Sequence, residues 1–362
     1  MSAAKAGVPM VNLRPLLDAT EAAWRANLER LFTRMHFILG EQVESFEQEL
    51  AAAFDARFAV CVGSGTSAVE LALRASRLAP GEVIVPALTS PFTAQAVLAA
   101  GYRLKFADVD PATLLLDTAD AASRVTARTR AVVPVHLYGQ PAPLPSLPRG
   151  VAVVQDACQA HGAPLRYSAP AAFSFYPTKN LPCLGDGGAV LTNSRSLAER
   201  VRQLRDGGRR NDQVSRIRAV NSRLDEMQAC YLRAFLPKLV EWNAERSRLA
   251  DLYDRLLADC PGVRPVARRE GSVCHLYVVR VRRRERLRKH LAANGIATGI
   301  HYPVPLHQQP AFREFAPKRG SFPIAERACR EILSLPLWPY ISGKDVQKIV
   351  DKIREIEPRT TV

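Results

Sequence analysis

The chain has 362 residues, of which 47% are hydrophobic and 23% are charged. These proportions exclude a disordered or fibrous chain, and the length favours two domains. The net charge of +15 permits nucleic-acid binding, but we find no helix-turn-helix and no aromatic-basic platform. No apolar stretch approaches the ~20 residues of a membrane span, and the start lacks a signal-peptide pattern. We therefore expect a cytoplasmic protein with no nucleic-acid or membrane partner.

The first predicted element is an N-terminal helical arm over Ala19–Phe54, with a break at Gly40. From Phe58 onward, short β-branched runs alternate with helix-like segments, which favours an α/β sheet covered by helices. The predicted strands are Phe58–Val62, Val83–Leu88, Arg103–Val109, Ala131–Tyr138, Val151–Asp156, Ala171–Tyr176 and Gly188–Thr192. The pattern predicts a large domain built on a mostly parallel sheet.

The last third of the sequence predicts a second domain. Leu224–Leu257 has a helical pattern that Pro237 interrupts, and Val263–Ile356 follows as a compact α/β segment. We therefore expect the arm and large domain in residues 1–235, and a linking helix with a small C-terminal α/β domain in residues 236–362. The seven cysteines contain no Cys-x-x-Cys pair, so we expect reduced thiols and no metal site.

Gly63–Ser67 follows a predicted strand and opens a predicted helix. Glycines let the backbone approach a phosphate, and the free amides and dipole of the helix favour its negative charge. A turn of this composition is also common for purely structural reasons. By itself the segment therefore does not indicate a binding site, and other functional residues must accompany it.

Functional residues of this kind lie in the segment Val151–Lys179. Asp156 ends a hydrophobic strand, where a carboxylate can reach a cleft at the sheet edge or cap the next turn. Ser174 and Lys179 lie at the end of an aromatic strand, and a lysine with apolar neighbours can act as a nucleophile. In this order, the residues supply a phosphate cradle, a partner for a protonated pyridine nitrogen and an imine-forming amine. A binding site for pyridoxal 5′-phosphate (PLP) requires these three groups.

The sequence resembles the DegT/DnrJ/EryC1/StrS family of PLP-dependent sugar aminotransferases over almost its whole length. This resemblance implies the type I, aspartate aminotransferase-like fold. The motifs that carry it are Phe37–Gly40, Gly63–Ser67, Val85–Thr89, Asp156–Gly162, Phe173–Asn180, Gly185–Gly188, Asn221–Asp225 and His301–His307.

By this resemblance, Lys179 forms the Schiff base with the cofactor and Asp156 binds the ring nitrogen. The cofactor-binding set that it implies is Gly65, Thr66, Ser67, Gln159, Ser174, Lys179 and Asn221. Within this set, Gln159 would bind the ring hydroxyl oxygen, and Thr66, Ser67 and Ser174 the phosphate. Asn221 matches an asparagine that reaches the cofactor of the neighbouring subunit, which implies a homodimer with shared active sites.

The resemblance also implies the substrates: an amino acid donor, expected to be glutamate, and a nucleotide-linked keto-deoxysugar. His301, Tyr302 and His307 match the substrate side of the family, and Arg209, Arg210 and Arg223 are candidates for binding a diphosphate. Cys158 and Cys183 are expected to be inert, and His161 to pack beneath the cofactor.

The sequence departs from the family pattern at Ser90, in a shorter stretch between Gly162 and Phe173, and at Ala219 and Val220 before Asn221. Ser90 stands where family members usually carry an aromatic residue that stacks on the ring, and Phe92 is a candidate substitute.

Several alternative functions stay open: a PLP-dependent sugar dehydratase, an aminohydroxybenzoate-type synthase, a PLP-fold binding protein without turnover, and a DNA-binding regulator. The lysine retained at position 179 disfavours those dehydratases in which histidine replaces it.

Overall fold

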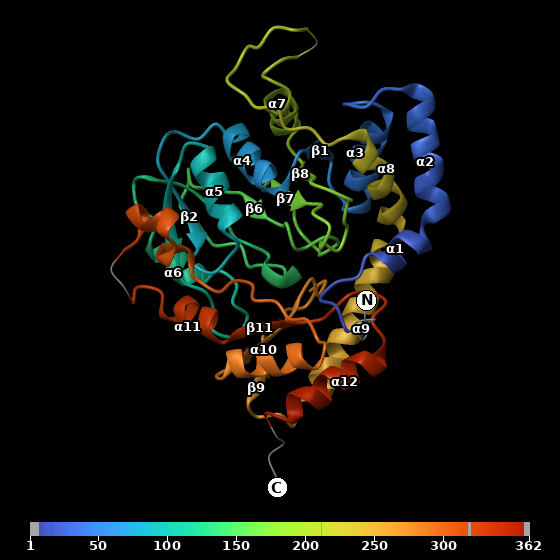
Figure 1. Ribbon diagram of the computed structural model, residues 1–362. Helices are drawn as coiled ribbons and strands as arrows, with labels where there is room; N and C mark the ends of the chain where they lie inside the picture. The colour runs from blue at the N-terminus through green and yellow to red at the C-terminus, as the bar shows by residue number, and fades with distance from the viewer. Residues whose placement is uncertain (1–6, 211, 318–319, 358–362) are drawn as a thin grey trace.

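The computed structural model describes residues 7–210, 212–317 and 320–357. The N-terminal arm forms helices α1 (Arg14–Ala19), α2 (Glu21–Arg34) and α3 (Glu41–Ala53). Gly40 caps α3, so the predicted break is confirmed. In Figure 1, α2 runs along the outside of the molecule next to α8 (Glu226–Phe235).

The central sheet consists of short strands. They are β1 (Phe58–Val62), β2 (Glu82–Pro86), β3 (Arg103–Ala107), β4 (Thr129–Val132), β5 (Ala152–Val153), β6 (Gln155–Asp156), β7 (Ala171–Ser174) and β8 (Gly188–Thr192). Strand β8 runs antiparallel to β1 and β7, and the other pairings are parallel. A parallel bridge between Val135 and Asp156 joins the two halves. The predicted mostly parallel sheet is confirmed.

The strand predicted over Ala131–Tyr138 ends early, at Val132. Pro134 has no backbone N–H to donate to a neighbouring strand, and the chain turns through the 3-10 helix η1 (Leu137–Gly139). Tyr138 has a φ of +61° within this turn, a value that non-glycine residues rarely adopt. The prediction was wrong for this half of the segment, of which Val135 lines the cavity described below.

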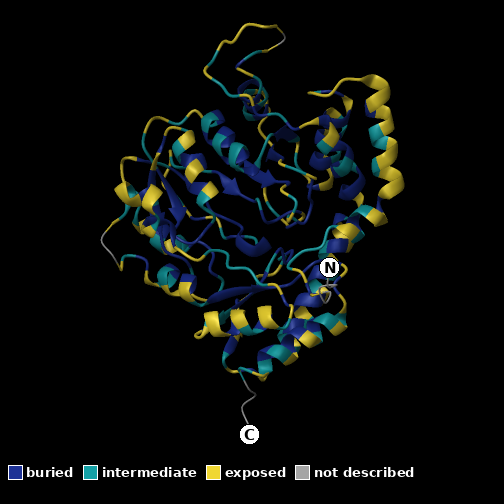
Figure 2. Ribbon diagram, in the orientation of Figure 1, coloured by how far each residue is buried: buried dark blue, intermediate teal, exposed yellow. Residues whose placement is uncertain are grey.

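Helices cover both faces of the sheet, as its apolar strands require. On one face lie α4 (Gly65–Ala75), α5 (Pro91–Ala99) and α7 (Arg195–Arg205). On the other lie α6 (Thr118–Ser123) and α3. Helix α4 packs against β7, β8, α5 and α7. Figure 2 shows the buried residues gathered along the sheet and the inner faces of the helices, with exposed residues on the outer faces.

The C-terminal part begins with a long helical segment that bends at Pro237, as predicted. It comprises α8, the 3-10 turn η2 (Leu236–Lys238) and α9 (Leu239–Leu257). After α9 come β9 (Val263–Pro265), β10 (Tyr277–Val281), α10 (Arg284–Ala293), β11 (Ile332–Leu335) and α12 (Gly343–Arg354). The strands form an antiparallel sheet in the order β11-β10-β9, below the large sheet in Figure 1.

One stretch of the C-terminal part packs on the large sheet instead. It includes η3 (Leu306–Gln308), η4 (Pro310–Phe315) and α11 (Pro323–Glu331). Phe312 and Phe322 are buried in the same core cluster as Val85 of β2. The carboxylate of Asp108 accepts hydrogen bonds from two backbone amides at the start of α11. The domain boundary at residues 235 and 236 stays a prediction.

In the part of the chain that the structure describes, no helix is both long and apolar enough to span a membrane.

Candidate active site

A cavity of about 650 Å³ opens at the carboxyl ends of the parallel strands. This edge is where ligands bind in α/β sheets of this kind. Asp156 at the end of β6, Ser174 at the end of β7 and the first residues of α4 line its floor. His301 and Tyr302 line it from the C-terminal part. Residues far apart in the sequence thus meet around one space.

The N-terminus of α4 presents unpaired backbone amides to this cavity. Ser64 caps the helix by accepting a hydrogen bond from the Ser67 amide at 3.1 Å. The cap leaves the first two amides of the helix, those of Gly65 and Thr66, without a partner among the described residues. Both residues line the cavity, whereas Ser67 does not. Of the three residues predicted to bind the phosphate, the structure therefore brings Thr66 and Ser174 to the cavity but not Ser67, and Gly65 of the wider cofactor-binding set also lines it.

Gly65 is required by a close approach between α4 and β7. A Cβ atom added at Gly65 would lie 2.5 Å from Cβ of Ser174 and 2.8 Å from Sγ of Cys158. Neither contact is sterically tolerable. The absence of a side chain at Gly65 is thus what allows the helix amides to lie next to the strand ends.

Asp156 is 5% exposed and is held on both carboxylate oxygens. The Thr93 hydroxyl donates to Oδ2 at 2.7 Å, and the Cys158 amide donates to Oδ1 at 3.1 Å. Thr89 lies 3.2 Å from the Thr93 hydroxyl oxygen. These contacts give the carboxylate a fixed orientation toward the cavity that it lines.

Lys179 lines the same cavity and is half-buried. Removal from water lowers the pKa of its amine, while the nearby Cys158 and Asp156 raise it. A lowered pKa increases the fraction of neutral amine, which is the nucleophilic form. The structure therefore places the predicted amine and the predicted carboxylate in one cavity.

Gln159 has its side-chain amide held from two sides. Its Oε1 accepts the backbone N–H of Tyr138 at 2.7 Å, and its Nε2 donates to the Tyr302 hydroxyl at 3.2 Å. Burial raises the pKa of the Tyr302 phenol to about 12, although hydrogen bonds from Ser90 and Gln159 oppose this shift. The phenol is therefore neutral at physiological pH.

Two histidines line the cavity beside Tyr302. His301 lies 2.9 Å from the Ser334 hydroxyl through Nδ1, and burial lowers its pKa to about 4. His275 was not among the predicted site residues. Its Nδ1 lies 3.1 Å from Oδ1 of Asn180, and burial lowers its pKa well below the ordinary value. Both imidazoles are neutral at physiological pH.

The structure does not bring His307 to this cavity. Its Nε2 lies 3.1 Å from Oε1 of Glu326, and its ring packs against Phe106 and Phe322 in the core. Phe92 does line the cavity, with 64% of its surface exposed. Ser90 caps α5 and also lines the cavity.

Asn221 lies outside this cavity and is exposed. It pairs through a backbone bridge with Asp206, the residue that caps the C-terminal end of α7, and the segment that follows α7 projects from the molecule in Figure 1. Arg209 and Arg223 both form ion pairs with Asp206, at 2.6 and 2.9 Å. The exposed Arg210 lies in the same segment. None of the three candidate arginines lines the cavity.

Three further residues were expected near the site, and all are buried or nearly buried: His161, Cys158 and Cys183. His161 is fully buried against the rings of Phe173 and Phe175, and burial lowers its pKa to about 3. Burial raises the pKa of the Cys158 thiol, and raises that of Cys183 to about 12. Both thiols are protonated at neutral pH, and the thiolate is the reactive form.

Sequence reasoning missed Thr93, His275 and the N-terminal residues Met10 and Val11, all of which line the cavity. Thr93 is tied to the site by Asp156, which is 63 residues away, so no local pattern marks it. His275 offers no local signal, since its partner Asn180 is 95 residues away. The N-terminal residues are placed by Val8, which pairs with Ile296 in the small domain.

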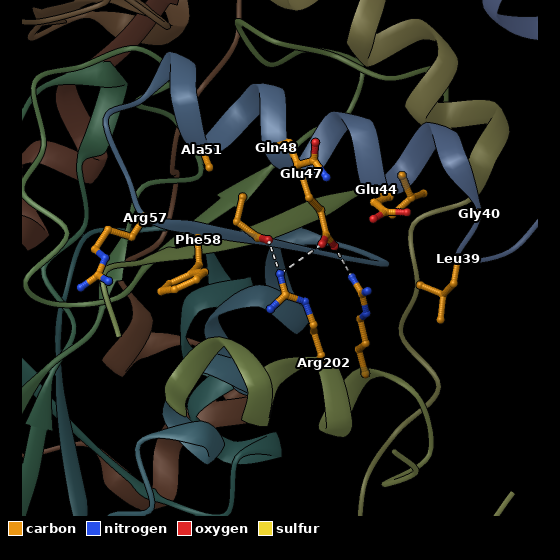
Figure 3. Close-up of a pocket in the computed structure, with 12 residues that line it drawn as sticks. Leu39, Gly40, Glu44, Glu47, Gln48, Ala51, Arg57, Phe58 and Arg202 are labelled. Carbon is orange, nitrogen blue, oxygen red and sulfur yellow. Dashed lines mark hydrogen bonds and ion pairs between the residues drawn. The ribbon is translucent and has the colours of Figure 1, made fainter. Parts of the chain in front are cut away.

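A second cavity, of about 430 Å³, lies between α3, β1 and α7 (Figure 3). Glu47 extends from α3 and pairs there with Arg202 and Arg205. Oε1 of Glu47 also accepts the Cys61 amide at 2.8 Å. The carboxylate thus joins α3 to β1 and α7, which is a structural role.

The comparisons with known proteins agree over nearly the whole chain. The sequence model of the DegT/DnrJ/EryC1/StrS aminotransferase family matches residues 19–354. A dTDP-3-amino-3,4,6-trideoxy-alpha-D-glucose transaminase of Streptomyces venezuelae is 43% identical over 96% of both chains. A pleiotropic regulatory protein of Geobacillus stearothermophilus is 37% identical over 96% of this chain and 98% of its own.

Among solved structures, S. venezuelae DesV in complex with a ketimine intermediate superposes with a TM-score of 0.93. It is 40% identical to this chain, and the match covers 99% of this chain and 100% of that one. These likenesses confirm the fold expected from the sequence.

Proposed function

Because the chain belongs to the DegT/DnrJ/EryC1/StrS aminotransferase family, we propose that it transfers an amino group from glutamate to a nucleotide-linked 3-keto-deoxysugar. PLP is the cofactor, and Lys179 is its attachment point. The observation that carries this proposal is the meeting of Lys179, Asp156 and the free amides of α4 around one cavity.

The residues present fit this cofactor. The unpaired amides of Gly65 and Thr66 suit a phosphate at the positive end of a helix, and the absence of a side chain at Gly65 lets this helix end lie next to Ser174. The oriented carboxylate of Asp156 suits a protonated ring nitrogen. The remaining N–H of Gln159 suits the ring hydroxyl oxygen.

When bound, PLP supplies a reactive aldehyde and a ring that accepts an electron pair. Lys179 would hold the aldehyde through its amine until an amino donor displaces it. The freed Lys179 amine would then act as general base toward the proton on the donor Cα and as general acid toward the cofactor carbon that carried the aldehyde. Asp156 would keep the ring nitrogen protonated, because a fixed carboxylate stabilises an adjacent positive charge.

The choice of sugar rests on the relatives. The S. venezuelae transaminase is named for a dTDP-linked sugar with its amino group at carbon 3, so we propose a 3-keto sugar attached to a nucleoside diphosphate. His301 and Tyr302 contribute polar groups to the substrate side of the cavity. Arg209 and Arg223 are paired with Asp206, so the exposed Arg210 is the remaining candidate for binding the diphosphate.

The proposal includes a homodimer in which Asn221 of one subunit serves the cofactor site of the other. Asn221 is exposed and lies outside the cavity of its own chain, as a residue directed at a partner subunit should be. The cytoplasmic location expected from the sequence stays a prediction.

The test separates the two halves of the reaction. Purified protein loaded with PLP is mixed with glutamate alone, and the visible spectrum should convert to that of the pyridoxamine form. A spectrum unchanged by glutamate and by other amino acids would contradict transamination and favour a binding protein. The pyridoxamine form is then mixed with dTDP-linked and UDP-linked 3-keto and 4-keto sugars, and mass spectrometry identifies the aminated product.

A further inference from the structure

The side-chain amide of Gln159 has only one possible orientation. The backbone N–H of Tyr138 can only donate, so the atom 2.7 Å from it must be the amide oxygen of Gln159. The amide nitrogen therefore faces the other way, where one of its two N–H groups donates to the Tyr302 hydroxyl at 3.2 Å. One N–H remains, on a side chain that is 5% exposed and lines the cavity.

These contacts belong to a closed ring of interactions. Tyr138 donates through its backbone to Gln159, and its phenol donates to the carbonyl of His301 at 2.6 Å. His301 is bonded to Tyr302, which accepts from Gln159. The ring joins the η1 turn of the large domain to a segment of the C-terminal part. Gln159 is thus held by residues on both sides of the cavity.

Within the proposed function, on which this inference rests, we propose that Tyr302 is a positioning residue for the cofactor. By accepting one N–H of Gln159, Tyr302 directs the other N–H at the ring hydroxyl oxygen of PLP. The sequence placed Tyr302 among the substrate residues, whereas its hydroxyl accepts a hydrogen bond from Gln159. The C-terminal segment thereby influences how tightly the large domain holds the cofactor.

Tyr302→Phe removes the acceptor and keeps the aromatic ring. A neutral hydrogen bond contributes about 1 kcal/mol, so the Kd for PLP should rise about 3- to 10-fold. A donor to the ring oxygen weakens the hold of that oxygen on a proton. Loosening Gln159 should therefore raise the apparent pKa of the visible absorbance of the holoenzyme, which a pH titration of the spectrum measures.

Gln159→Ala supplies the decisive comparison. If Tyr302 acts through Gln159, adding Tyr302→Phe to Gln159→Ala should change neither the Kd for PLP nor the spectral pKa any further. Additive effects would overturn the inference, as would a Tyr302→Phe protein with the Kd and spectrum of the wild type. Ser90→Ala removes the other hydroxyl beside Tyr302 and should shift both quantities in the same direction by less.

Tyr102→Phe is the matched control. The Tyr102 phenol donates one hydrogen bond to the Leu78 carbonyl at 3.2 Å, away from the cavity, so this variant should leave the Kd and the spectral pKa unchanged. Thermal unfolding of each apoprotein checks that the variants fold. A wild-type protein that binds no PLP would overturn both the function and this inference. A spectral shift in Tyr302→Phe without turnover of any sugar would overturn the proposed function alone.

Discussion

Thr93 donates a 2.7 Å hydrogen bond to Asp156 across 63 residues of sequence. The bond links the first turn of α5 to the end of β6. It fixes one carboxylate oxygen, and the Cys158 amide fixes the other. A carboxylate that is oriented before the cofactor binds needs no reorganisation during the reaction. Thr93 therefore belongs to the site as a support for Asp156.

Thr93→Val keeps the shape of the side chain and removes this donor. Hydrogen bonds to charged groups contribute ~1.5 kcal/mol or more, so kcat/KM with glutamate should fall about tenfold. Stopped-flow absorbance of the glutamate half-reaction measures this. Thr20→Val, which removes a buried hydroxyl bonded to the Leu16 carbonyl in the arm, should leave the rate unchanged. Equal rates for Thr93→Val and the wild type would contradict the role of Thr93.

Lys179→Arg should abolish covalent attachment of PLP, because a guanidinium stays charged and cannot form the imine. Turnover should fall by about 10³-fold or more, since both the attachment point and the general base are lost. Borohydride reduction followed by peptide mass spectrometry should find PLP on Lys179 in the wild type and nowhere in the variant. Lys105→Arg, on β3 and paired with Glu82, is the control that retains the label. Label on another lysine would overturn the assignment.

Mixed dimers test whether Asn221 acts across the subunit interface. Lys179→Ala and Asn221→Ala should each be impaired as homodimers. In a mixed dimer, the subunit with an intact Lys179 receives an intact Asn221 from its partner, so about half of the sites formed in mixed dimers should be active. If Asn221 instead served its own chain, mixing would restore nothing. Activity after denaturation and co-refolding of differently tagged chains distinguishes the two cases.

The buried His161 should make the stability of the protein depend on pH. The unfolded chain binds a proton on this side chain near pH 6.5, but burial holds the pKa at about 3 in the folded state. Between these values the unfolded state binds more protons, so the free energy of unfolding falls as pH decreases, by up to about 1.4 kcal/mol per pH unit. In apo His161→Phe, urea unfolding at pH 7 and pH 5 should show a smaller decrease. An unchanged decrease would contradict this prediction.

Glu226 should be essential for docking of the N-terminal arm. Its carboxylate is 1% exposed and accepts the amides of Gly40, Gln42 and Val43 at 2.7, 2.8 and 3.1 Å. Glu226→Ala leaves these donors buried and unpaired, so the free energy of unfolding should fall by about 3 kcal/mol. Glu226→Gln, which keeps one acceptor oxygen, should lose less. Chemical unfolding measures both.

Glu241→Ala is the control for this measurement. Glu241 forms an exposed pair with Lys238, and such pairs contribute little to stability. Its loss should change the free energy of unfolding by less than about 0.5 kcal/mol. A similar loss in Glu226→Ala and Glu241→Ala would show that Glu226 does not hold the arm.

The sequence by itself determined the features that depend on neighbouring residues. Gly63–Ser67 was predicted to follow a strand and open a helix, and the structure confirms both, with β1 ending at Val62 and α4 beginning at Gly65. Gly40 and Pro237 marked helix boundaries correctly, because glycine and proline limit what the local backbone can do. The order of Asp156, Ser174 and Lys179 predicted one site, since strand ends meet at the edge of a parallel sheet.

Only the tertiary structure decided which side chains support the site. Thr93 reaches Asp156, and Tyr302 reaches Gln159 across 143 residues, through contacts that no local pattern encodes. His307, by contrast, packs against Phe322 in the core and does not line the cavity. Local sequence restricts the conformations of each segment, but the partners of a side chain depend on how distant segments pack together.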